Sequence, residues 1–239
     1  MELEEDFIAS KVIPSGRRVW ELAPRSGGSV WTLLFLDAEL YIERVNAPTV
    51  VKELQRAGNI PSVHSIFVSN ESAPARHVDY TCNPTYSRFL IEDVLSWLTR
   101  KHPNMPCNNM VIVGLSLSGL AAAFAATQYS DQFPNAICQS PSFWWNDEWF
   151  RRTFGEQQSR TRFWISVGNL EKQENVTHPP TGMMQRASQI DACRRTWNLL
   201  KSRGYVVRDH IFEGSHDPNC WREDLALALS WALEINGER

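Results

Sequence analysis

The amino-acid sequence predicts an α/β fold, a three-layer α/β/α sandwich around a central, mostly parallel sheet. Short apolar runs alternate along the chain with amphipathic segments, the order expected where strands and helices follow one another. Residues 30–36 (VWTLLFL) are apolar without interruption, as in a strand that is buried on both faces. A further apolar run, 110–114 (MVIVG), leads through a serine-containing turn into an alanine-rich segment with helical character.

Length and composition restrict the class of protein. The 239 residues suit one domain with its own core, so we assign 1–239 to a single domain in which 1–28 form an N-terminal strand or hairpin extension. The 24 Lys and Arg residues against 27 Asp and Glu residues give a net charge of −3, which argues against a globally basic nucleic-acid-binding surface but leaves a local basic patch open. Hydrophobic residues make up 43% of the chain, which excludes intrinsic disorder.

The N-terminal half of the chain is expected to alternate strands and helices. Strands are predicted at 18–22, 30–36 and 63–68, and helices at 50–57 and from 84 to about 100. Ser15 and Gly16 form a turn before the first of these strands, and Gly58 suits the left-handed conformation that often ends a helix. Asn83 and Pro84 are typical of a helix N-cap followed by the first helical position. The polar segment 69–83 is expected to be a loop.

The C-terminal half is expected to continue the alternation. Strands are predicted at 110–114, 136–139, 163–167 and 205–212, and helices from 117 to about 129, from 184 to 200 and at 221–235. The helix before this half ends at Lys101, His102 and Pro103, because proline cannot continue a helix. The alanines between 121 and 126 would let their helix pack closely against the sheet.

Cysteine usage and the N-terminal sequence indicate the compartment. The five cysteines are widely spaced and include no Cys-x-x-Cys pair, which favours free thiols in a reducing compartment and gives no metal-binding pattern. The first residues, Met-Glu-Leu-Glu-Glu-Asp, are acidic where a secretory signal is basic. No run reaches the ~18 apolar residues of a membrane helix. We therefore expect a soluble cytoplasmic protein without nucleic-acid or membrane partners.

Residues 111–120 (VIVGLSLSGL) carry the most specific chemical signal. A strand ends, Ser116 occupies a tight turn and a helix begins, which is the context of a nucleophile elbow. Neighbours two positions away must be small so that strand and helix can approach, and Gly114 and Ser118 are both small. The usual pattern G-x-S-x-G has a glycine where this chain has Ser118. Ser116 is the candidate nucleophile, and the alternative is a plain strand–turn–helix with an unreactive serine.

A serine nucleophile needs a base, and His216 has the right place among the six histidines. It lies in a Gly-Ser-His-Asp-Pro loop between a strand and the last helix, and such loops meet at one edge of a parallel sheet. Glu171, just past the strand 163–167, would complete the order Ser, acid, His. Glu174 and a Ser–His dyad without an acid stay open, whereas Asp217 is adjacent to the histidine and less suited to reach its ring.

An oxyanion formed at Ser116 would need two backbone N–H donors. Leu117 directly follows the nucleophile and is the first candidate. The second donor should come from the loop after the strand 30–36, where Ala38 or Glu39 is the candidate. This chemistry requires no metal and no organic cofactor.

Several segments resemble one known family. Residues 111–145, from VIVGLSLSGL to PSFWW, are similar to the elbow region of enterochelin (enterobactin) esterases, which are α/β-hydrolases of the esterase D type. Two more segments agree, 35–41 (FLDAELY) and 213–229 (EGSHDPNCWREDLALAL). The segment 76–83 is similar to the family pattern R-x-x-[DE]-x-x-C-N. The resemblance covers about residues 30–235 in consistent order.

The resemblance implies the α/β-hydrolase fold and a substrate class. Such enzymes cleave the ester bonds of cyclic catechol trilactone siderophores, in the ferric or the free form. In that setting Arg76 would bind an anionic substrate or form a local ion pair with Asp79, and Asn83 would belong to the same site segment. Trp144 and Trp145 would line the cleft for aromatic rings or fill the core.

Other functions stay open on the sequence. A general or feruloyl-type carboxylesterase, a thioesterase or an acyltransferase could use the same scaffold and the same serine. A binding module with an inert catalytic set is the non-enzymatic alternative. The expected partner is a small-molecule ester, in one case a ferric siderophore, and the protein is expected to be a monomer or a homodimer.

Overall fold

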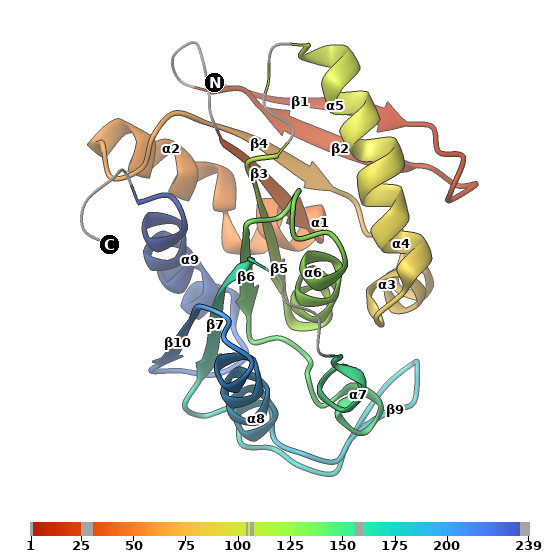
Figure 1. Ribbon diagram of the computed structural model, residues 1–239, viewed down its shortest axis with the longest axis vertical. Helices are drawn as coiled ribbons and strands as arrows, with labels where there is room; N and C mark the ends of the chain where they lie inside the picture. Colours follow the sequence, from red (N-terminus) through yellow and green to blue (C-terminus); the bar gives the residue numbers. More distant parts are fainter. Residues whose placement is uncertain (1, 25–30, 104, 106–107, 156–159, 235–239) are drawn as a thin grey trace.

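The computed structural model describes residues 2–24, 31–103, 105, 108–155 and 160–234. Its main feature is an eight-stranded sheet with the order β1-β2-β4-β3-β5-β6-β7-β10 (Figure 1). The strands are β1 (Leu3–Ile8), β2 (Arg17–Leu22), β3 (Trp31–Leu36), β4 (Val63–Val68), β5 (Met110–Leu115), β6 (Asn135–Gln139), β7 (Arg162–Gly168) and β10 (Val207–Phe212). Strands β4, β3, β5, β6, β7 and β10 run parallel to one another. At one edge β2 pairs antiparallel with β4, and β1 pairs antiparallel with β2.

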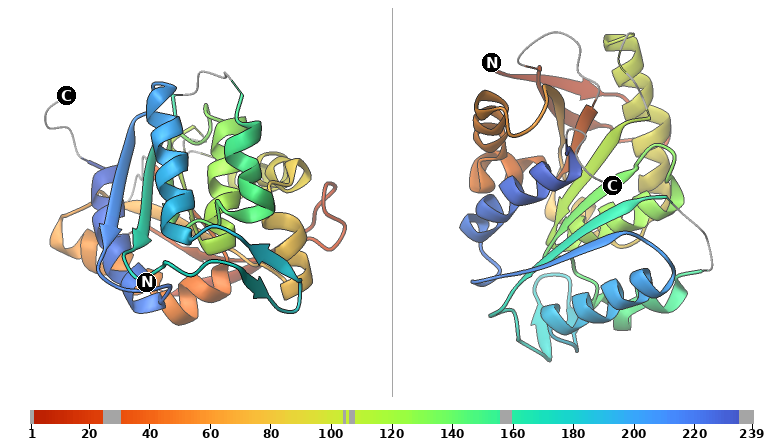
Figure 2. Two further views of the ribbon diagram at one scale, coloured as in Figure 1. Left: turned by 90° about the horizontal axis from the view of Figure 1, so that it is seen from below. Right: turned by 60° about the vertical axis from the view of Figure 1, so that its left-hand side comes forward.

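Helices cover both faces of this sheet (Figure 2). They are α1 (Ala38–Leu40), the π-helix η1 (Tyr41–Val45), α2 (Ala47–Ala57), α3 (Ala73–Tyr80), α4 (Pro84–Phe89), the π-helix η2 (Leu90–Val94), α5 (Leu95–Lys101), α6 (Ser116–Gln128), α7 (Trp145–Thr153), α8 (Gln189–Ser202) and α9 (Pro218–Ala232). Within the described part of the chain, no helix has both the length and the apolar character needed to cross a membrane.

Alternate residues of the central strands feed two separate cores. On β5, Ile112 packs in the core under α4, α5, α6 and α8, whereas Val111 and Val113 pack in the core under α2 and α9. This is the period of two expected when side chains point to opposite faces of a strand. It also explains why the sequence of the strand is apolar without interruption, since neither face meets water.

Most predicted elements are present at nearly the predicted positions. The strand 63–68 agrees at both ends, and the predicted helix 84–100 is the continuous run α4, η2 and α5. Asn83 is the N-cap of α4, because its side chain accepts a hydrogen bond from the N–H of Thr85 at 2.9 Å. Val30 and the end of the last predicted helix, residue 235, lie outside the described residues.

Two predictions are wrong. The segment 69–83 is not a loop throughout, because it contains α3, whose N-cap Ser72 accepts a hydrogen bond from the N–H of Ala75. The helix predicted from Met184 begins only at Gln189, because Ser188 caps it there. Residue 184 lies instead in β9 (Met183–Gln185), which pairs with β8 (Val176–His178) in a small separate hairpin.

Candidate active site

Ser116 lies at the junction of β5 and α6 in a strained turn. Its φ of 53° is in the left-handed region that side chains other than glycine disfavour. The turn is tight, since a Cβ added to Gly114 would lie 2.1 Å from the carbonyl oxygen of Ser118. The Ser118 hydroxyl accepts from the N–H of Leu115 at 3.0 Å and donates to its carbonyl at 2.7 Å. Ser118, which stands where the usual pattern has glycine, is therefore hydrogen-bonded to the last residue of β5.

His216 lies between β10 and α9 and faces Ser116. Its Nε2 is 3.0 Å from Ser116 Oγ, and its Nδ1 is 2.6 Å from Glu171 Oε2. A carboxylate can only accept, so Nδ1 carries a proton and donates it to Glu171, which leaves Nε2 free to accept from the serine hydroxyl. The ring also meets Trp221 edge-to-face, with 4.7 Å between the ring centroids.

Glu171 is buried and has three hydrogen-bond partners. Besides the histidine contact through Oε2, its Oε1 accepts from the N–H of Gly168 at 2.8 Å and from the hydroxyl of Ser140 at 2.6 Å. Ser140 in turn accepts from the indole N–H of Trp221 at 3.0 Å. Glu174, the alternative acid, is exposed. These contacts fix the orientation of the carboxylate toward His216.

Asp217 has a different partner. Its side chain accepts from the N–H of Asn219 at 2.9 Å and caps α9. This cap helps to define the end of the loop that carries His216. Sequence reasoning did not single out Ser140, although it directly follows the predicted strand 136–139 and so lies at the same sheet edge as the other site residues.

The two candidate oxyanion donors differ in position. Leu117 lies in the first turn of α6, where N–H groups have no intrahelical partner, and it lines the cavity beside Ser116. Ala38 begins α1 after Asp37, whose φ is 60°, but it is fully buried and is not among the residues that line the cavity. The role of its N–H therefore stays a prediction.

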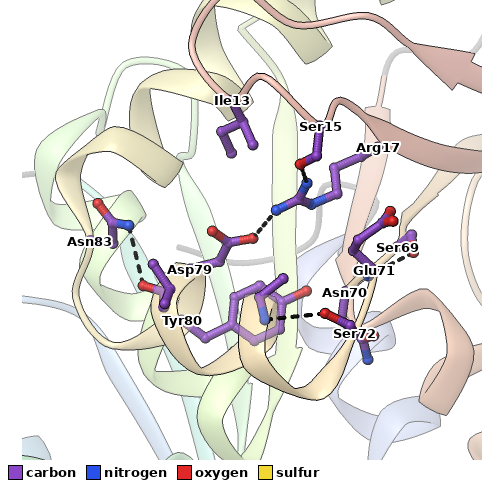
Figure 3. A network of polar contacts seen from close by, with 12 residues as sticks. Ile13, Ser15, Arg17, Ser69, Asn70, Glu71, Ser72, Asp79, Tyr80 and Asn83 are labelled. Carbon is purple, nitrogen blue, oxygen red and sulfur yellow. Dashed lines mark hydrogen bonds and ion pairs between the residues drawn. The ribbon is translucent and has the colours of Figure 1, made fainter.

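Arg76 pairs with Asp37, not with Asp79. Its Nε lies 2.8 and 2.9 Å from the two carboxylate oxygens of Asp37, and its Nη2 lies 2.6 Å from one of them. Burial would lower the pKa of Arg76, but the pairing with Asp37 raises it. Asp79 is instead the partner of Arg17 from β2 (Figure 3). Arg76 thus lines the cavity with its charge already matched, and it anchors the loop after β3.

A cavity of about 510 Å³ opens at Ser116 and His216. Trp144 forms part of its wall and stacks on His178 of β8, with 4.9 Å between ring centroids and 12° between ring planes. The indole N–H of Trp144 donates to Gln189, at the start of α8. The β8–β9 hairpin, which the sequence did not predict, therefore supplies one side of the cavity.

Trp145 and Asn83 are not among the residues that line this cavity. Trp145 meets Trp149 edge-to-face with 6.1 Å between ring centroids. Asn83 caps α4 and donates to the carbonyl of Val78 at 3.2 Å. The structure thus uses both side chains in packing or capping.

Three buried cysteines do not compete with Ser116 as nucleophiles. Burial raises the pKa of the thiols of Cys82, Cys138 and Cys193, so little thiolate forms at neutral pH. Cys107 lies outside the described residues. A cluster of metal-ligand type, Glu21 with His64 and His102, lies away from this cavity.

The family model described as "Putative esterase" matches residues 12–232. This chain belongs to that esterase family. The iron(III) enterobactin esterase of Dickeya dadantii (strain 3937) is 24% identical over 206 residues, which cover 84% of this chain and 47% of that protein. The enzyme of the same name from Escherichia coli (strain K12) is 21% identical over 240 residues, 95% of this chain and 56% of its own length. The chain thus spans about half the length of these two relatives.

Solved structures agree with the esterase assignment at the level of the fold. The enterobactin esterase FES from Shigella flexneri, crystallised in the presence of enterobactin, matches 97% of this chain and 59% of its own, with a TM-score of 0.83 and 19% identity. A ferulic acid esterase matches 98% of this chain and 99% of its own, with a TM-score of 0.76 and 15% identity. The predicted α/β-hydrolase fold and the family resemblance are confirmed.

Proposed function

We propose that this esterase hydrolyses ester bonds of a catechol trilactone siderophore, using Ser116, His216 and Glu171 as a catalytic triad. The observation that supports this proposal is the unbroken series of contacts from Ser116 Oγ through His216 to Glu171, at 3.0 and 2.6 Å, beside the cavity. This order of groups is that of serine hydrolases, in which the acid fixes the histidine tautomer and the histidine takes the serine proton.

The reaction would run through an acyl-enzyme. His216 Nε2 accepts the Ser116 proton as Oγ attacks the ester carbonyl, and the N–H of Leu117 stabilises the oxyanion with the proposed N–H of Ala38. The imidazolium, stabilised by Glu171, then protonates the leaving alkoxide. A water that His216 deprotonates attacks the acyl-enzyme, and Ser116 regains its proton as the acid is released.

The lining of the cavity supports an aromatic, oxygen-rich substrate. Trp144 and His178 offer a stacked aromatic wall, and Gln173 and His77 offer groups that hydrogen-bond to phenolic oxygens. The curated relatives named above are iron(III) enterobactin esterases. Both observations favour a siderophore ester over a simple alkyl ester. Any iron would arrive with the substrate.

The test is product analysis with a serine variant and a matched control. Ser116→Ala should lower the hydrolysis of ferric and iron-free enterobactin, followed by mass spectrometry, by at least ~10³-fold because the nucleophile is lost. Ser96→Ala removes a hydroxyl that donates to the Glu92 carbonyl on the exposed side of α5, and it should retain full activity. Full turnover by Ser116→Ala in a folded protein would refute the triad, and activity on simple aryl esters alone would refute the substrate.

A feruloyl-type esterase is the second candidate. A ferulic acid esterase has the same fold over 98% of this chain, and the aromatic wall of Trp144 and His178 also suits a feruloyl ring. Comparing kcat/KM for methyl ferulate and for enterobactin decides between the two. A ratio that favours methyl ferulate by ~100-fold or more, about 2.7 kcal/mol, would assign the second activity.

A further inference from the structure

Two histidines and a glutamate that the esterase chemistry does not use converge at the opposite end of the sheet. Glu21 lies near the end of β2, His64 near the start of β4, and His102 is the C-cap of α5. Ser116 follows the carboxyl end of β5, which runs parallel to β4. The cluster, at the start of β4, and the catalytic loops therefore lie at opposite ends of the parallel strands. The three elements are far apart in sequence, and their ligand atoms all lie within 4.8 Å of one another.

Both imidazoles approach the same carboxylate oxygen. The Nε2 atoms of His64 and His102 each lie 2.6 Å from Glu21 Oε1. His64 is fully buried and Glu21 is 4% exposed, whereas the side chain of His102 is 31% exposed. Neither Nε2 makes a hydrogen bond of acceptable geometry, although both are shielded from solvent. The two rings meet edge-to-face at 88°, so both nitrogens can face one point.

The surroundings of His64 indicate which of its nitrogens faces Glu21. Its Nδ1 is 3.1 Å from the thioether sulfur of Met105. This contact leaves Nε2 as the nitrogen directed at the carboxylate, 2.6 Å from Oε1. Two imidazole nitrogens and a carboxylate oxygen, which are all common metal ligands, thus meet at one largely buried point.

We propose that Glu21, His64 and His102 bind one divalent transition-metal ion of the Zn²⁺ type. Two imidazole nitrogens and one carboxylate oxygen form a donor set that suits Zn²⁺ and leaves a fourth position for solvent on the half-exposed side of His102. Zn–N and Zn–O bonds of ~2.0–2.1 Å need ligand separations of about 3.3 Å, so small outward shifts of the side chains admit the ion.

Neighbouring groups hold these ligands in place. Lys101 Nζ lies 2.7 Å from Glu21 Oε2, which leaves Oε1 as the oxygen directed at the histidines. The Met105 sulfur, to which the Thr32 hydroxyl also donates at 3.2 Å, fixes the ring of His64. Contacts of this kind orient metal ligands in known sites. A bound ion would join β2, β4 and α5, so its role would be structural.

The test is metal binding by the full chain after chelation and removal of the chelator. Isothermal titration with ZnCl₂ should give one Zn²⁺ per chain, and Zn²⁺ but not Mg²⁺ should raise the Tm. His102→Gln and Glu21→Gln should weaken this binding by at least ~100-fold, because even the loss of a residue that only orients a metal ligand costs about 10–100-fold. His102 is half-exposed, so His102→Gln should fold, and circular dichroism checks this.

His210→Gln is the matched control. His210 also contacts a carboxylate, with Nδ1 2.7 Å from Asp224, and its side chain is 30% exposed, but it belongs to a different part of the sheet. This variant should bind Zn²⁺ like the parent protein. The proposal is overturned if the parent protein binds no Zn²⁺ in preference to Mg²⁺, or if folded His102→Gln binds Zn²⁺ as tightly as His210→Gln. Both outcomes are independent of ester hydrolysis, so the proposed function is judged separately.

Discussion

At the scale of single residues, the reactivity proposed for Ser116 depends on how Glu171 uses its two carboxylate oxygens. Oε1 is held by the N–H of Gly168 and the hydroxyl of Ser140, which leaves Oε2 for the Nδ1–H of His216. Because the carboxylate is buried and oriented, it can fix the histidine tautomer without competition from water. An exposed carboxylate on a loop could not do this as well.

Exchanging Glu171 for glutamine tests this role. Glu171→Gln should lower kcat by about 10²- to 10⁴-fold with little change in KM, because an amide can present its NH₂ group to Nδ1 and favour the wrong tautomer. Steady-state kinetics on an activated aryl ester would measure the effect. Glu174→Gln is the control, since Glu174 is exposed and should affect kcat less than ~2-fold. The reverse result would assign the acid to Glu174.

Single-residue predictions from the sequence succeed where position along the chain determines the neighbours. Ser116, Glu171 and His216 each follow a parallel strand, so the topology alone brings them to one edge of the sheet. Partners of charged groups are harder to predict. Arg76 has a carboxylate three residues away, but its guanidinium pairs with Asp37. The sequence could not predict this pair, because a single side-chain contact between distant segments leaves no periodic pattern.

At the scale of elements, the junction of β5 and α6 shows how tightly a strand and a helix can approach. The Cα of Gly114 lies so close to the first turn of α6 that an added Cβ would be 2.1 Å from Ser118 O and 2.4 Å from its carbonyl carbon. Both atoms belong to the backbone, which cannot give way as a flexible side chain would. The turn that carries Ser116 therefore depends on this glycine.

Replacing Gly114 by alanine should disrupt the elbow. Gly114→Ala should lower the free energy of unfolding by about 3 kcal/mol or more, because overpacking against backbone forces β5 and α6 apart. Gly155→Ala is the matched control, since a Cβ there meets nothing within 4 Å and its effect should be within about 0.5 kcal/mol. Urea unfolding of both variants measures the difference. Equal stability of the two would show that the junction can relax.

Elements differ in how well the sequence predicts them. The parallel strands are apolar runs because both of their faces are buried, and this pattern is visible without a structure. Helix α3 was missed because much of it is polar and Val78 is 58% exposed, so it lacks a strong apolar stripe. Its start was marked by Ser72 and Pro74, a cap followed by proline in the first turn. The three-residue strands β8 and β9 are too short to show a period of two.

At the scale of the whole molecule, the antiparallel edge of the sheet is connected to the catalytic cavity. Arg17 of β2 is 2% exposed and pairs with Asp79 of α3 (Figure 3). Ser15 also accepts from the Arg17 guanidinium, at 2.6 Å. Because α3 carries Arg76 and His77 into the cavity wall, the position of this wall depends on an ion pair with the N-terminal strands.

Removing the Arg17 charge should therefore affect both stability and substrate binding. Arg17→Met should lower the free energy of unfolding by about 3–5 kcal/mol at pH 7, because it leaves the buried carboxylate of Asp79 without a partner. It should also raise KM more than it lowers kcat, since α3 forms the cavity wall but does not carry the triad. Arg18→Met is the control, because this neighbour is 49% exposed and its 4.0 Å contact with Glu39 should contribute less than about 1 kcal/mol.

The dependence of this loss on pH separates a buried charge from a lost packing contact. Burial raises the pKa of Asp79, and Arg17 opposes that rise. Without Arg17 the folded-state pKa must rise further above the unfolded value, so the folded state binds the proton more tightly and stability falls as pH increases above the unfolded pKa of about 3.9. Urea unfolding should therefore show a larger difference between Arg17→Met and Arg18→Met at pH 7 than at pH 5. If the difference is the same at both pH values, Arg17 acts through packing alone. In Arg17→Met/Asp79→Leu, which has no buried charge to leave unpaired, most of the lost stability should return.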